Sequence, residues 1–187
     1  MKVATVTLKG VTSYSPGKHV SVPPKEKEAK EDYEKRTWRE RAHYDKDGVA
    51  FVPGMAFKKC LETAARFLSV NIKGRGKATY TKHFKAGVLV IENLSLGVER
   101  EDVEGNWLFV PSDGKPGGQS RVNRCFPIFH EWGGDVKFHI LDDTITRPIF
   151  EQHIKEAGNF IGVGTFRPER GGYFGRFSVE NIEWQEE

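Results

Sequence analysis

The residues with the clearest chemical potential form a glycine-rich run, Gly162–Phe177, near the end of the chain. Five glycines within 14 residues let the backbone approach a ligand closely or adopt positive φ angles. Exposed backbone N–H groups bind anions, guanidinium groups match phosphate with two hydrogen bonds, and aromatic rings stack on bases. The run therefore predicts phosphate or nucleic-acid binding. The side chains and glycines concerned are Gly162, Gly164, Gly171, Gly172, Gly175, Arg167, Arg170, Arg176, Phe166, Tyr173 and Phe174.

A second group of candidate contacts lies in residues 53–86, which carry eight basic side chains against one acid, Glu62. A local excess of positive charge of this kind favours a polyanion as ligand, whereas the net charge of +3 by itself says little. Residues 25–47 instead mix eight basic with eight acidic side chains, as a solvated face does. The basic candidates are Lys58, Lys59, Arg66, Lys73, Arg75, Lys77, Lys82 and Lys85, to which Arg121 and Arg124 are added from a later segment.

The position of the glycine-rich run excludes two common phosphate motifs. A dinucleotide fingerprint has its glycines after a strand and before a helix, whereas here a predicted helix precedes the run and a strand follows it. A Walker loop would need Gly-Lys-Ser/Thr, which is absent. The alternative to anion binding is a tight loop whose only role is to set the direction of the last strand.

The elements that must position these residues follow from hydrophobic periodicity and from glycine and proline breaks. Strands are expected at residues 2–9, 87–97, 135–141 and 177–184, and a short run at 49–52 leads into Pro53-Gly54. Amphipathic helices are expected at 53–70 and 145–158, with a charged helix or mobile insertion at 25–43 and a basic loop or hairpin at 71–85.

Without its insertions this order reads βαββαβ, the ferredoxin-like α+β arrangement of a four-stranded antiparallel sheet with two helices on one face. Residues 11–48 and 99–127 would be inserted projections on a single domain spanning 1–187. The chain is long enough for one domain with a substantial core.

Two segments of the chain resemble the RAMP superfamily, the repeat-associated proteins of CRISPR systems, which are built on ferredoxin-like folds. Residues 51–61, with Val52-Pro53-Gly54 before a helix, are similar to the segment that opens the first helix in that superfamily. Residues 162–177 are similar to its glycine-rich loop, in the expected place before the last strand. The two motifs cover about 30 residues, and the element order extends the resemblance to most of the chain.

The resemblance implies a backbone-type subunit of a CRISPR effector complex. Such a subunit binds single-stranded nucleic acid, with RNA favoured over DNA. It polymerises along the strand with copies of itself and contacts other effector subunits. The 99–127 excursion would be a thumb or an inter-subunit arm. Alternatives are a phage-encoded single-stranded-DNA-binding protein and an anti-CRISPR mimic of such a subunit.

A further alternative is a metal-independent endoribonuclease, because processing members of the superfamily use histidine as a general acid or base. His83, inside the basic segment, and His19, in the loop after the first strand, are the weak candidates for that role. The resemblance also points to Asp45 and Asp47 as aspartates before the first helix, although Asp-Lys-Asp-Gly is an ordinary turn. A non-catalytic binding subunit is the expectation.

Metal, cofactor and membrane roles are not indicated. Cys60 and Cys125 lie far apart with no CxxC partner, and no metal-ligand spacing or cofactor motif is present. No apolar run approaches the roughly 20 residues that cross a bilayer, and the N-terminus lacks the pattern of a signal peptide, so a cytoplasmic location is expected.

Overall fold

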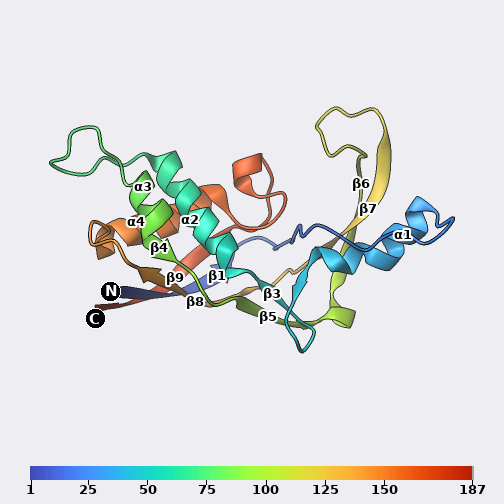
Figure 1. Cartoon of the computed structure of the whole chain (residues 1–187), viewed down its shortest axis with the longest axis horizontal. Helices are drawn as coiled ribbons and strands as arrows, with labels where there is room; N and C mark the ends of the chain where they lie inside the picture. Colours follow the sequence, from blue (N-terminus) through green and yellow to red (C-terminus); the bar gives the residue numbers. More distant parts are fainter. Residues whose placement is uncertain (187) are drawn as a thin grey trace.

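The computed structural model describes residues 1–186, and its centre is a four-stranded antiparallel sheet in the order β4-β8-β1-β9. The strands are β1 (Lys2–Gly10), β4 (Val88–Leu89), β8 (Gly133–Ile140) and β9 (Phe177–Glu186). Helix α2 (Gly54–Leu68) connects β1 to β4, and α4 (Arg147–Glu156) connects β8 to β9. Both helices lie on the same face of the sheet (Figure 1). The predicted ferredoxin-like βαββαβ fold is confirmed.

The core lies between that sheet and its helices, because both kinds of element bury one side. In β1 every second residue, Ala4, Val6 and Leu8, is buried. In α2 the buried residues follow the helical repeat, with Phe57, Cys60, Leu61, Ala64 and Ala65 facing the sheet. Removal of these apolar surfaces from water is the main force that holds the layers together.

The Pro53-Gly54 pair is explained by the start of α2. Pro53 is the extended residue before the helix, and the Gly54 N–H donates to Asn93 Oδ1 at 3.0 Å. A Cβ at Gly54 would overlap the carbonyl oxygens of Glu92 and Val90, so only glycine lets the segment 90–93 cross the helix start.

The strand expected at 87–97 is divided between two sheets, which corrects its predicted extent. Its first residue, Gly87, ends the helix α3 (Thr81–Gly87), and the next two residues form β4. Its last part is β5 (Leu94–Glu99), which pairs with β3 (Val49–Val52) and not with the main sheet. Together with β2 (His43–Tyr44) these strands form a small sheet in the order β2-β3-β5.

Both predicted insertions have regular structure. Residues 11–48 contain α1 (Lys30–Thr37) and the 3₁₀ turn η1 (Trp38–Arg41). Residues 99–127 contain the 3₁₀ turn η2 (Arg100–Asp102) and most of the hairpin of β6 (Glu104–Pro111) and β7 (Arg121–Ile128). In Figure 1 the hairpin and α1 form two arms at one end of the molecule.

A buried ion pair joins these arms. Arg41 donates to both carboxylate oxygens of Glu34, at 2.7 and 3.1 Å, and also to the Cys125 carbonyl. The Cys125 N–H donates in turn to Glu34 at 2.8 Å. Two side chains thus make the hydrogen bonds that a neighbouring strand would make with β7.

Two short helical segments lie between α4 and β9. The π-helical turn η3 (Ala157–Ile161) continues α4, and η4 (Pro168–Arg170) lies inside the glycine-rich run. No helix within residues 1–186 is both long and apolar enough to cross a membrane.

Candidate nucleic-acid interface

The basic loop, residues 71–80, presents its cations on a projecting turn. Ile72 and Tyr80 are buried and anchor the base of the loop, where the Ile72 N–H donates to the Ala78 carbonyl at 2.8 Å. Gly74 and Gly76 adopt positive φ values of 80° and 60°, which allow the tight turn between them. Within residues 1–186 the exposed side chains of Lys73, Arg75 and Lys77 have no hydrogen-bond or ion-pair partner.

The cations on α2 are more strongly neutralised than those of the basic loop. Lys58 lies 3.7 Å and Lys59 3.1 Å from Glu62. Lys58 also donates to the Lys85 carbonyl at 2.7 Å. Burial would raise the pKa of Glu62, but the hydrogen bond from Lys59 and the nearby lysine charges lower it, so the carboxylate stays ionised. Arg66 on α2 and Lys82 and Lys85 on α3 are exposed, and the basic loop lies between these two helices in the chain.

The glycine-rich run is folded tightly on itself and on residues 12–15. A Cβ at Gly175 would overlap the Val163 carbonyl, one at Gly172 the Phe166 carbonyl, and one at Gly164 the Ser15 carbonyl. Backbone N–H groups along the run donate to carbonyls of the chain, including Val163 to Gly175 and Thr165 to Ser15. The close approach that glycine permits is therefore used for packing within the protein.

The arginines of this run differ in how free they are. Arg167 donates to Glu169 at 2.8 Å and to the Gly164 carbonyl at 2.9 Å, and Arg176 donates to the Asn159 carbonyl at 3.1 Å. Arg170 is exposed, and the described residues offer it no side-chain partner. Tyr173 is 78% exposed, so it is the ring of this run that is most accessible for stacking.

Arg121 and Arg124 belong to a different surface. They lie on β7, at the opposite end of the long axis from the basic loop (Figure 1). There they line a groove of about 1030 Å³ between the hairpin and the arm that carries α1. Lys18, Lys30 and Phe109 line the same groove and were not among the predicted contacts. In the sequence these three residues are recognisable only as basic or aromatic residues within an insertion. The sequence does not show that the two arms face each other.

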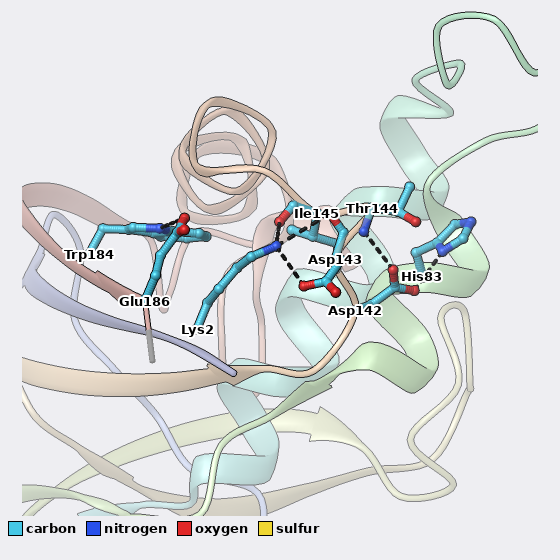
Figure 2. Close-up of polar contacts among 8 residues, drawn as sticks. All are labelled: Lys2, His83, Asp142, Asp143, Thr144, Ile145, Trp184 and Glu186. Atoms are coloured by element: carbon cyan, nitrogen blue, oxygen red, sulfur yellow. Dashed lines mark hydrogen bonds and ion pairs between the residues drawn. The ribbon is translucent and has the colours of Figure 1, made fainter.

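His83 points into the protein rather than toward the basic surface. Its Nδ1 lies 2.6 Å from Asp142 Oδ2, and the other oxygen of Asp142 accepts the Thr144 N–H at 2.8 Å (Figure 2). Burial raises the pKa of Asp142, but hydrogen bonds from His83 and Thr144 outweigh this and lower it. The Nε2 of His83 is buried and has no partner in the described part of the chain, and its Nδ1 is held by Asp142.

The other proposed catalytic groups show no assembled site. His19 is exposed at the edge of the groove. Asp45 Oδ1 accepts the N–H groups of Asp47 and Val49, both at 2.9 Å, as in an ordinary turn. Within residues 1–186 no three His, Cys, Asp or Glu side chains are grouped closely enough to hold a metal ion.

Both cysteines are buried, and burial is the main cause that raises the pKa of each thiol, to about 11 for Cys125. Thiols with raised pKa values are poor nucleophiles at neutral pH.

The chain is similar to known proteins in structure and not in sequence. No family model and no curated protein matches the sequence. Among solved structures, the crystal structure of Cmr6 from Pyrococcus furiosus matches 96% of this chain and 99% of that one, with 14% sequence identity and a TM-score of 0.48.

Proposed function

We propose that this chain is a non-catalytic subunit that binds single-stranded nucleic acid, and that the basic loop makes its main phosphate contacts. The observation that carries the proposal is the set of three cations at the loop tip, Lys73, Arg75 and Lys77, none of which has a counter-ion among residues 1–186. When unpaired cations neutralise phosphates, the counterions condensed on the nucleic acid are released, and this release is the main source of sequence-independent affinity.

The preference for RNA, the assembly of several copies along a strand and the place in a CRISPR effector complex rest on a separate argument. They come from the resemblance of residues 51–61 and 162–177 to the RAMP superfamily. The ferredoxin-like order of the main sheet is compatible with that resemblance.

The binding test reverses the charge of the loop tip. In the combined variant Lys73→Glu, Arg75→Glu, Lys77→Glu we expect loss of affinity for all sequences alike. The slope of log K against log salt should become less steep by about 2, because single strands contribute roughly 0.7 for each phosphate contact. Fluorescence anisotropy with labelled RNA and single-stranded DNA at several salt concentrations measures both quantities.

The matched control is the combined variant Lys9→Glu, Lys46→Glu, Lys137→Glu, which makes the same change in net charge at exposed positions away from the basic loop. It should retain most of the wild-type affinity. Equal affinity of the loop variant and wild type would remove the basic loop from the proposal.

Absence of catalysis is tested on the same samples. Labelled hairpin RNA should stay intact during long incubation with the wild-type protein, with chelator and with added divalent ions. Cleavage that disappears in His83→Ala or His19→Ala would instead establish the endoribonuclease alternative.

A further inference from the structure

The groove between the two arms is lined by charged side chains together with apolar and aromatic ones. The loop 17–24 and α1 form one wall, and the β6–β7 hairpin forms the other. Its volume of about 1030 Å³ is at the upper end of the range for sites that enclose a small molecule. Figure 1 shows that the two arms diverge from the body of the molecule at this end.

The acidic side chains of the groove are already neutralised by partners. Two hydrogen bonds from Arg36 to Glu28, at 2.7 and 2.8 Å, are the main cause that lowers the pKa of Glu28 to about 2. Glu34 is paired with Arg41, and Glu31 lies 2.9 Å from Lys35.

The basic side chains of the groove are free by comparison. Arg121 and Arg124 each use one guanidinium nitrogen on a backbone carbonyl, that of Phe109 and that of Ser112, both at 3.2 Å. Neither has a carboxylate partner within residues 1–186. Lys18 and Lys30 are exposed on the opposite wall, and no side chain of the described residues pairs with either of them. Five basic and three acidic side chains line the groove, and four of the basic ones have no carboxylate partner within residues 1–186. The chemistry that complements these four cations is a chain of anions.

An aromatic ring lies among these cations. Phe109 is 60% exposed, and the Arg121 guanidinium carbon lies 6.0 Å from the centre of its ring. An exposed ring next to unpaired guanidinium groups combines a surface for base stacking with donors for phosphate. An acidic peptide would use the cations but would leave the ring without a specific role.

We propose that this groove holds a second stretch of the single strand that the basic loop binds, with its phosphates on Arg121, Arg124, Lys18 and Lys30 and a base on Phe109. The inference rests on the proposed function and extends it. One strand then contacts both ends of the molecule, and the α1 arm and the hairpin close on it from two sides.

The test compares a short strand of about 8 nucleotides with a long one of about 40, since a short strand occupies a single site of the usual size. In Arg121→Glu, Arg124→Glu the affinity for the long strand should fall about tenfold or more, and its salt slope should become less steep by about 1.4. Phe109→Ala should weaken long-strand binding about fivefold or more, and Phe109→Tyr should restore it.

The matched control is Lys46→Glu, Lys137→Glu, which makes a charge change of the same size at exposed residues that do not line the groove. Photo-crosslinking of RNA that carries 4-thiouridine, followed by peptide mapping, should identify residues 109–126 as well as residues 71–80. Circular dichroism and thermal unfolding establish that each variant is folded.

The outcomes separate this inference from the proposed function. If the groove variant binds long strands like its control while the basic-loop variant does not, the groove inference is wrong and the proposed function stands. If wild type binds no strand of either length, the proposed function has failed, and the groove inference fails with it. Binding of polyglutamate that only the groove variant loses, with unchanged nucleic-acid affinity, would reassign the groove to an acidic peptide.

Discussion

At the scale of single residues, His153 is the buried titratable group on which stability should depend most clearly. Its Nδ1 lies 2.6 Å from the Ile149 carbonyl, and its ring stacks on Phe84 with centroids 4.4 Å apart. Its Nε2 is buried and lacks a partner within residues 1–186. Burial lowers the pKa of His153 from its ordinary value of 6.5, although the hydrogen bond to Ile149 opposes this shift.

This shift predicts a pH dependence of stability. The folded state binds fewer protons than the unfolded state, so the free energy of unfolding should fall as pH drops below 6.5. The loss is at most about 1.4 kcal/mol for each pH unit. Urea denaturation at a series of pH values measures it. His153→Gln should show a smaller decrease, with a remainder from His43, whose pKa burial also lowers. An unchanged decrease in this variant would exclude His153 as its source.

The two thiols give a second residue-scale prediction. Because burial raises the pKa of Cys60 and Cys125, neither should react appreciably with a thiol reagent in the folded protein at neutral pH. Both should react at once in denaturant. Fast labelling under native conditions would mean that the core or the junction between the arms opens readily.

At the scale of elements, the glycine-rich run is the clearest case in which packing explains a sequence motif. Gly175 combines a φ of 77° with a Cβ position blocked by the Val163 carbonyl. Gly171, in the same run, has a similar φ of 78° but open space around its Cβ position. A comparison of alanine substitutions at Gly175 and Gly171 therefore distinguishes the effect of steric overlap from that of backbone strain.

Gly175→Ala should therefore destabilise the protein by roughly 1–3 kcal/mol more than Gly171→Ala, in which only the strain is present. Thermal or urea unfolding of the two variants measures the difference. If the run serves packing, Gly171→Ala should also leave nucleic-acid affinity unchanged. Equal stability of the two variants would contradict the close packing of Gly175 against the Val163 carbonyl.

The elements also show what a sequence can and cannot predict. The main strands and helices were predictable because their apolar residues repeat with periods of two or close to 3.6. The division of residues 87–97 between two sheets was not predictable. A dense apolar run has no period that would reveal where residues 90–93 cross the start of α2 at Gly54. The glycines of the run were visible, but the direction in which its N–H groups point depends on contacts with residues 12–15, far away in the sequence. The pairing of Lys58 and Lys59 with Glu62 follows from helical spacing and could have been predicted.

At the scale of the whole molecule, the proposed cationic contacts are divided between two segments, the basic loop and the arms around the groove, which lie at opposite ends of the long axis (Figure 1). The net charge of +3 hides this division. If seven cations at the two ends contact phosphates together, log K for a long RNA should fall with log salt with a slope of about −5. Titrations at a series of salt concentrations measure this slope. A value near −2 would mean that one end alone binds.

The hydrogen bonds of Glu34 and Arg41 to Cys125 have a consequence for association between chains. An unpaired strand edge is a template on which another chain can add, and proteins block such edges to avoid aggregation. Here a carboxylate and a guanidinium occupy the edge of β7 at Cys125, so strand addition is prevented there while α1 and η1 stay docked. Arg41→Ala would leave Glu34 as an unpaired buried charge, and the arm should detach. The hairpin would then be open to pairing along its length, and light scattering should detect self-association.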